Sequence, residues 1–330
     1  MNRLQVVIAL GAVSACTFAD SGGFGGEVGA GPDAGAQPSI DAGDTSAPDA
    51  APAVACVGKA GQPQDAVWTI AHGGRERTVR VHVPASYVPS QATPLWLNFH
   101  GYAMNAEWQA EVTALEQRAE TYGAIVVHPE GTGAIKGWNA GACCGSATLT
   151  DVDDVGFVEA LLDRLEDELC VDGDRVFASG FSNGGFLSHR LACELAPRIA
   201  AIATVSGVMG IDDCAPARPV PVLSFHGTSD LTVPYEGSWV FGFRSEEDSI
   251  AGWVERNGCT GAAIETYAMG DARCVTRGNC TAGADVGLCT IDGGGHQWPG
   301  GEAIPASGKV SHDLDASDAI WAFFAAHPRP

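Results

Sequence analysis

The chain has 330 residues, 45% of them hydrophobic, which is enough to bury one large core. Its 40 acidic side chains outnumber the 18 Lys and Arg residues and leave a formal net charge of −22. Because this charge repels nucleic acid and anionic lipid surfaces, the composition argues against a nucleic-acid partner.

The first 16 residues have the composition of an export signal. Met1-Asn2-Arg3 supplies a positive charge, and the apolar run over residues 4–15 is too short to span a bilayer. The run ends in Val-Ser-Ala-Cys, which resembles the bacterial lipoprotein signal. We therefore expect residues 1–16 to direct export and Cys16 to carry a lipid that is the protein's sole membrane attachment, at the cell surface or outer membrane. The alternative is an ordinary secretory signal that ends near a Cys.

The next segment, residues 17–55, consists largely of Gly, Ala, Asp, Pro and Ser. Such a segment buries too little apolar surface to offset the entropy lost on ordering. We expect it to be a flexible linker and residues 56–330 to form the catalytic domain.

Cysteine usage agrees with export. Eleven Cys residues are present, and removing Cys16 for lipidation leaves an even ten, for which disulfides are the expected state outside the cytoplasm. Cys193 and Cys214 bracket one predicted helix-strand unit and are a candidate pair. A weaker alternative is a zinc site, although no C-x-x-C pair occurs. Its candidate ligands are Cys143, Cys144, Cys274, Cys280 and Cys289.

Short apolar strands alternate with amphipathic segments from Cys56 onward. A hairpin is predicted over residues 66–70 and 77–83, turned at His72-Gly73-Gly74. Further strands are predicted over residues 95–99, 124–127, 175–180, 199–205, 221–225, 264–267 and 286–291. Helices are predicted over residues 107–122, 153–169, 184–195, 246–256 and 313–326. The alternation predicts an α/β fold with a mostly parallel sheet, helices on both faces, and disulfide stabilisation.

A candidate nucleophile lies in Gly180-Phe181-Ser182-Asn183-Gly184, a G-x-S-x-G sequence. The motif alone is weak in a chain with 43 Gly residues, but here it falls between a predicted strand and a predicted helix. That context makes a sharp turn that raises Ser182 above the sheet. An ordinary turn serine is the alternative.

A serine hydroxyl needs a base and an acid in the chain order Ser, acid, His. Asp230 follows the predicted strand 221–225, and His296 follows the strand 286–291, so both lie where ligands bind in open α/β sheets. We predict His296 as general base and Asp230 as the carboxylate that orients it. Asp212 and Asp213 are nearby alternatives for the acid, and His296 as a solvated loop residue is the alternative for the base.

The tetrahedral intermediate of acyl transfer needs N–H donors, each worth roughly 2.7–4 kcal/mol. We expect the backbone N–H of Asn183, directly after the nucleophile, to be one donor. The second is predicted to be the backbone N–H of Tyr102, in the loop after the strand that ends in His100-Gly101.

Six motifs in order then resemble one known family. They are His100-Gly101, Gly137-Trp138-Asn139 with Cys143-Cys144-Gly145, Asp153-Asp154-Val155-Gly156-Phe157, GFSNGG at Ser182, HGTSD at Asp230 with Val233-Pro234-Tyr235, and GGGHQWPG at His296. Together they are similar to the polyhydroxybutyrate depolymerase-type (LpqC-like) esterases, which include feruloyl and acetylxylan esterases. The similarity covers residues 56–326.

The resemblance implies an α/β-hydrolase fold, the triad Ser182, Asp230 and His296, and neither metal nor organic cofactor. It also implies that Trp138, Asn139 and Trp298 line the substrate cleft, and we place His100 with them as a substrate-binding candidate. From the residues alone, a Trp is as readily a core residue.

The expected function is therefore a secreted serine esterase that acts on a small-molecule or polymer ester. Polyester depolymerases of this type carry a separate binding domain after the catalytic one, whereas this chain ends soon after its last predicted helix. We therefore expect soluble feruloyl or acetyl esters to be better substrates than solid polyester. Two other functions stay open: a serine peptidase of the same fold, and a non-catalytic, glycan-binding surface lipoprotein. The natural ester and the oligomeric state stay open too.

Overall fold

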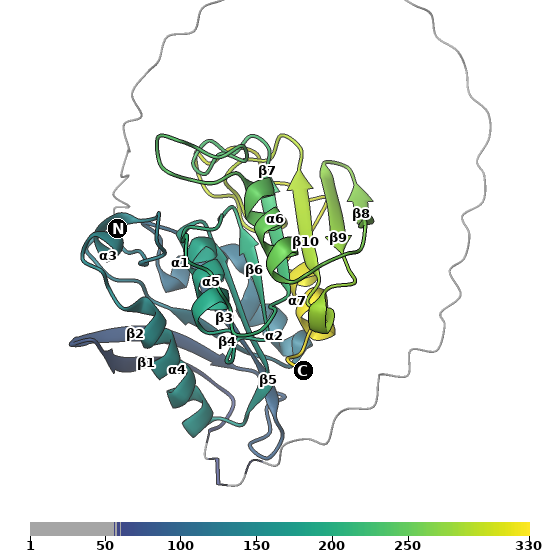
Figure 1. Ribbon diagram of the computed structural model, residues 1–330. Helices are drawn as coiled ribbons and strands as arrows, with labels where there is room; N and C mark the ends of the chain where they lie inside the picture. The colour runs from purple at the N-terminus through teal and green to yellow at the C-terminus, as the bar shows by residue number, and fades with distance from the viewer. Residues whose placement is uncertain (1–55, 57, 60) are drawn as a thin grey trace, which may run out of the picture. The chain divides into compact units, whose positions relative to one another are not determined.

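The structure, a computed structural model, describes residues 56, 58–59 and 61–330. The predicted signal segment 1–16, its Cys16, and the linker 17–55 lie outside the described residues. Ten strands form one sheet with helices on both faces, which confirms the predicted α/β class (Figure 1). The strands are β1 (Gln64–His72), β2 (Arg75–Val83), β3 (Thr93–Phe99), β4 (Ile125–Pro129), β5 (Val171–Phe181), β6 (Ala201–Val205), β7 (Val222–Gly227), β8 (Ala263–Met269), β9 (Ala272–Arg277) and β10 (Val286–Ile291).

The strand order across the sheet is β1-β2-β4-β3-β5-β6-β7-β10-β9-β8. The six central strands from β4 to β10 pair in parallel, whereas β1, β2, β9 and β8 extend the two sides in antiparallel fashion. Parallel pairing brings the carboxyl ends of β5, β7 and β10 to one edge of the sheet. Loops that follow these three strands therefore meet.

Helices cover the two faces of the sheet as two separate sets. The set α4, α5 and α6 packs on one face through residues such as Phe157, Phe186 and Trp253. The set α1, α2 and α7 packs on the other face through Leu115 and Phe324, among others. The helices are α1 (Ala106–Thr113), α2 (Leu115–Tyr122), α3 (Gly145–Leu149), α4 (Asp154–Glu168), α5 (Asn183–Glu194), α6 (Glu246–Arg256) and α7 (Ala316–Ala326), with a short 3₁₀ turn η1 (Thr281–Gly283).

The predicted hairpin forms at one side of the sheet as β1 and β2. Gly73 and Gly74 turn the chain with φ values of 57° and 72°, the left-handed conformation that a two-residue hairpin of this kind requires. Side chains with a Cβ atom are strained there, which explains the glycine pair.

Several elements differ from prediction, among them the short helix α3, which was not predicted. The helix predicted over residues 107–122 is broken into α1 and α2 at Ala114, which has φ 51° and ψ 29°. The hydroxyl of Thr113 donates to the carbonyl of Gln109, a bond that competes with regular helix geometry at this point. Strand β9 was not predicted; it pairs between β8 and β10 and makes the second antiparallel side of the sheet.

All ten Cys residues of the described part pair in five disulfides, and the predicted pair Cys193–Cys214 is confirmed. The zinc alternative is wrong, because every cysteine it would use is bonded to another cysteine. Closing the 114-residue separation between Cys56 and Cys170 restricts the unfolded chain, which is worth about 4–5 kcal/mol in a chain-entropy model. The pairs are Cys56–Cys170, Cys143–Cys144, Cys193–Cys214, Cys259–Cys280 and Cys274–Cys289.

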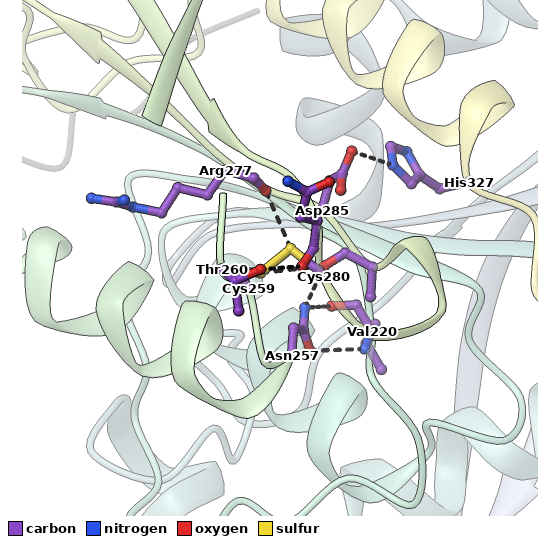
Figure 2. The surroundings of a disulfide bond; sticks show 10 residues. Val220, Asn257, Cys259, Thr260, Arg277, Cys280, Asp285 and His327 are labelled. Carbon is purple, nitrogen blue, oxygen red and sulfur yellow. Dashed lines mark hydrogen bonds and ion pairs between the residues drawn. A yellow bond between two sulfur atoms is a disulfide. The ribbon is translucent and has the colours of Figure 1, made fainter. Parts of the chain in front are cut away.

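The carboxyl end of α6 is fixed in place by one of these bonds and by Asn257 (Figure 2). The Asn257 side chain donates to the carbonyls of Val220 and Ala284 and accepts from the backbone N–H of Val220, at 2.7, 2.9 and 3.2 Å. The Cys259–Cys280 disulfide lies beside it. Together they hold α6 against the segment that leads into β7. None of the described helices combines the length and apolarity needed to cross a bilayer.

Candidate active site

Ser182 lies at the sharp turn between the end of β5 and the start of α5. Its φ of 53° and ψ of −123° are uncommon for a residue with a side chain and cost about 1–3 kcal/mol. The flanking glycines make the turn possible: a Cβ atom on Gly180 would lie 2.3 Å from the backbone of Gly184, and one on Gly184 would lie 2.2 Å from the carbonyl of Phe99. This is the strained turn that the G-x-S-x-G pattern predicts.

Asp230 and His296 are joined by a hydrogen bond of 2.7 Å between Asp230 Oδ2 and His296 Nδ1. The other carboxylate oxygen of Asp230 accepts from the backbone N–H groups of Thr232 and Val233 at 2.8 and 2.9 Å. Burial opposes ionisation of Asp230, but hydrogen bonds from His226 and His296 outweigh it and hold its pKa well below the usual range. A carboxylate here places a proton on Nδ1 of His296 and leaves Nε2 as an acceptor.

The two loops that carry Asp230 and His296 are bonded to each other. The Ser229 N–H donates to the carbonyl of Gly294 at 2.9 Å, which fixes the residues next to Asp230 against those next to His296. A Cβ atom on Gly227 would lie 2.3 Å from the same carbonyl oxygen, so only glycine permits this approach.

His296 lies beside the turn that carries Ser182. Its ring packs on Phe181, the residue before the serine, with ring centroids 4.7 Å apart. Ser182, Asp230 and His296 are 7%, 3% and 7% exposed. Within the described part of the chain, no hydrogen bond joins Ser182 Oγ to His296. The structure therefore brings the three predicted residues to one edge of the sheet, with Asp230 and His296 already hydrogen-bonded.

The two predicted donor amides flank the serine. A Cβ atom on Gly101 would lie 3.2 Å from Cβ of Ser182, which places the Tyr102 loop against Ser182. The N–H of Tyr102 donates to no other group of the described residues. Asn183 is the first residue of α5, so its N–H has no acceptor within the helix. Both amides are free to bind an anionic oxygen.

Comparison with known proteins relates this site to esterases. Residues 82–229 match the family model described as Esterase PHB depolymerase. Feruloyl esterase B of Piromyces equi is 36% identical over 67% of this chain, although the chain spans only 42% of that protein's length. Feruloyl esterase C of Emericella nidulans is 31% identical over 77% of this chain and 84% of its own length. The chain belongs to the PHB depolymerase esterase family.

The fold comparison agrees with this family. An acetyl xylan esterase from Aspergillus awamori superposes with a TM-score of 0.57, covering 79% of this chain and 99% of that one. At 12% identity the similarity concerns the fold alone. The esterase therefore has the α/β-hydrolase fold of a carboxylic ester hydrolase family that includes feruloyl and acetylxylan esterases.

The four predicted substrate-binding residues of this esterase are buried, and their polar groups are used within the protein. His100 donates from Nδ1 to the carbonyl of Gly101 at 2.7 Å and accepts at Nε2 from the N–H of Gly131 at 2.9 Å. Burial lowers the pKa of His100 to about 4, so the ring stays neutral at neutral pH. His100 joins two loops rather than facing a cleft.

Trp138, Asn139 and Trp298 also lie in the interior, at 0%, 5% and 0% exposure. The indole of Trp138 donates to the carbonyl of His100 at 2.9 Å, and that of Trp298 donates to Ser317 at 3.1 Å. The Asn139 side chain is likewise bonded to loop residues, Asp151 and Val152. With both rings enclosed, neither Trp presents a face on which a substrate could stack, which differs from the expectation that they line the cleft.

Several strongly exposed apolar side chains lie on the segment between Asp230 and α6. Ser238 and Phe243 pair across a tight turn whose tip bears Trp239, 93% exposed, with Val240 and Phe241 beside it. Leu231, directly after Asp230, is 92% exposed. This tip was not predicted as part of the site; the signal for it in the sequence is a run of large apolar residues within a predicted loop.

Proposed function

We propose that the protein is a serine esterase that cleaves carboxylic esters through an acyl-enzyme, with Ser182 as nucleophile, His296 as base and Asp230 as orienting acid. One observation carries the proposal: the 2.7 Å bond from Asp230 to His296 beside the strained serine turn. Feruloyl and acetyl esters are the proposed substrate class, because proteins similar to this chain bear those names.

The proposed reaction needs no group beyond these residues. Nε2 of His296 takes the proton of Ser182 Oγ as the oxygen attacks the ester carbonyl carbon. The carbonyl oxygen becomes an anion and accepts hydrogen bonds from the backbone N–H groups of Tyr102 and Asn183. The imidazolium of His296 then donates its proton to the departing alcohol, and the acyl group stays on Ser182.

Water completes the cycle. His296 removes a proton from water as its oxygen attacks the acyl carbon, and the proton passes to Ser182 Oγ when the carboxylic acid leaves. Asp230 remains a carboxylate throughout and stabilises the imidazolium that forms twice in each turnover.

A panel of three substrates distinguishes this proposal from its alternatives. We expect hydrolysis of p-nitrophenyl acetate and methyl ferulate and no cleavage of a chromogenic dipeptide. A peptidase of the same fold would cleave the dipeptide in preference, and a glycan-binding lipoprotein would cleave none of the three. A serine esterase is favoured over a non-catalytic, glycan-binding lipoprotein because Ser182, Asp230 and His296 are all present in this chain.

We also propose that the esterase is exported and attached through Cys16. Five disulfides favour an oxidising compartment. In a bacterial host fed a labelled fatty acid, the wild type should carry the label and sediment with membranes, whereas Cys16→Ser should do neither. Unlabelled wild type with a free Cys16 would refute the attachment.

A further inference from the structure

A second histidine lies directly behind the proposed acid. His226 is on β7, and its side chain is completely buried. Its Nδ1 is 2.9 Å from Glu246 Oε2, and its Nε2 is 2.7 Å from the carbonyl oxygen of Val233. Glu246 is the first residue of α6 and is also completely buried.

The partners of His226 determine its protonation. A carbonyl oxygen only accepts, so Nε2 facing Val233 carries a proton. Glu246 begins a helix, where the positive end of the helix dipole favours a carboxylate, and a carboxylate facing Nδ1 accepts a hydrogen bond from a second N–H group of the ring. Burial opposes the charge, but the hydrogen bonds and charges of Asp230 and Glu246 outweigh it and raise the pKa of His226 to about 10. The ring is therefore an imidazolium at neutral pH.

This cation faces the oxygen that the proposed base uses. His226 Nε2 is 3.5 Å from Asp230 Oδ2, and the same oxygen accepts the 2.7 Å bond from His296. The four side chains thus lie in the order Glu246, His226, Asp230 and His296. Their charges alternate in sign when His296 is the imidazolium that forms during the proposed reaction. A fixed positive charge on the far side of Asp230 favours its carboxylate form, the form that accepts the bond from His296.

Other titratable groups around the pair have partners of their own. The Tyr235 ring meets the edge of His226 at 5.7 Å between centroids, and its hydroxyl contacts Thr290. Lys309 lines a small cavity next to His226, but its ammonium is paired with Asp271 at 2.6 Å. A third ring, that of His189, is close to Glu246, and burial lowers its pKa to about 4, so it is neutral.

We infer that His226 and Glu246 are positioning residues for the triad: the buried imidazolium, held by Glu246, fixes Asp230 as a carboxylate and so keeps the Asp230–His296 pair in its working form at lower pH. The inference rests on the proposed function of Ser182, Asp230 and His296. It adds a second histidine–carboxylate pair, His226 and Glu246, which acts on the proposed triad through Asp230 and does not contact the substrate.

The test is the pH profile of kcat/KM for p-nitrophenyl acetate in Glu246→Gln and in His226→Gln. Removing the cation should let the hydrogen-bonded Asp230–His296 pair take a proton at higher pH, so the acidic limb moves upward. A move of one pH unit is about a tenfold loss of kcat/KM on that limb, with a much smaller loss on the alkaline plateau. We expect both variants to move in this direction.

A matched control is His128→Gln. His128 is a buried histidine on β4, whose ring nitrogens have no hydrogen-bond partner in the described part of the chain, and three strands separate β4 from β7. This variant is expected to lose stability without moving the acidic limb. If Glu246→Gln and His226→Gln lowered kcat/KM equally at every pH, the two residues would be structural only and the inference would be overturned.

A second measurement does not depend on turnover. In Ser182→Ala protein labelled with ¹⁵N-histidine, both ring nitrogens of His226 should stay protonated through pH 8, with the resonance assigned by its loss in His226→Gln. Adding Glu246→Gln should remove one of the two protons near neutral pH. A neutral His226 at pH 7 in the parent would overturn the inference. Turnover by Ser182→Ala would instead overturn the proposed function, so the two failures are distinguishable.

Discussion

Replacing Ser182 with alanine should lower kcat for p-nitrophenyl acetate by about 10⁶-fold, the size of loss seen when such a nucleophile is deleted. The change removes one oxygen from a side chain that is 7% exposed. Within the described residues that oxygen makes no hydrogen bond, so its removal leaves no partner unsatisfied. Alanine and serine also tolerate the turn's positive φ about equally. The melting temperature should therefore stay close to that of the wild type.

Ser188→Ala is the matched control for that substitution. Ser188 is a buried serine on α5, two turns from the nucleophile at most, and its hydroxyl donates to the carbonyl of Gly184 at 2.9 Å. This variant should keep most of its turnover. Activity above a few per cent in pure Ser182→Ala would exclude Ser182 as the nucleophile. Mass spectrometry should also find a trapped acyl group on the wild type and none on Ser182→Ala.

Elements governed by local pattern were the ones predicted from the sequence. Helix α6 and strand β10 have the predicted bounds, 246–256 and 286–291. The helix has an amphipathic pattern, the strand is a short and mostly apolar run, and a glycine follows each within two residues. The edge at which Ser182, Asp230 and His296 meet also followed from the sequence, since parallel strands bring their carboxyl ends together. Their roles remain the proposal that the substitutions test.

Features that depend on distant partners were not predicted. The sequence does not show that the indole of Trp298 donates to Ser317, 19 residues later, or that Trp138 bonds to a carbonyl 38 residues earlier. These bonds place both rings in the core. Strand β9 forms because it pairs with β10 on one side and β8 on the other, a tertiary context that a short, partly polar segment does not reveal.

His226 is the same kind of case. In sequence it is one residue of the segment that leads to Asp230, and Glu246 is one of several acids at the start of a helix. Only the packing of α6 against β7 brings the two within 2.9 Å. The pairing therefore depends on the tertiary fold and not on spacing along the chain.

Asp230→Asn should lower kcat by about 10⁴-fold, because it puts the proton of His296 on the wrong nitrogen. The Oδ1 position accepts from the N–H groups of Thr232 and Val233, so the carbonyl oxygen of the new side chain must stay there. Its NH₂ group then faces His296 Nδ1. Because an NH₂ group only donates, Nδ1 has to accept the hydrogen bond and therefore carries no proton. The ring proton moves to Nε2, the atom that has to accept the proton of Ser182.

The same NH₂ group would also face His226 Nε2–H, 3.5 Å from the replaced oxygen, so two donors would meet in a buried site. We therefore expect reduced thermal stability as well as the loss of kcat, with KM changed far less than kcat, since Asp230 does not contact the substrate. Asp292→Asn is the control, because Asp292 is exposed and makes one long contact of 3.4 Å with Thr228 in the neighbouring loop. If Asp230→Asn kept kcat within tenfold of the wild type while Asp292→Asn did not, the orienting acid would have been assigned to the wrong carboxylate.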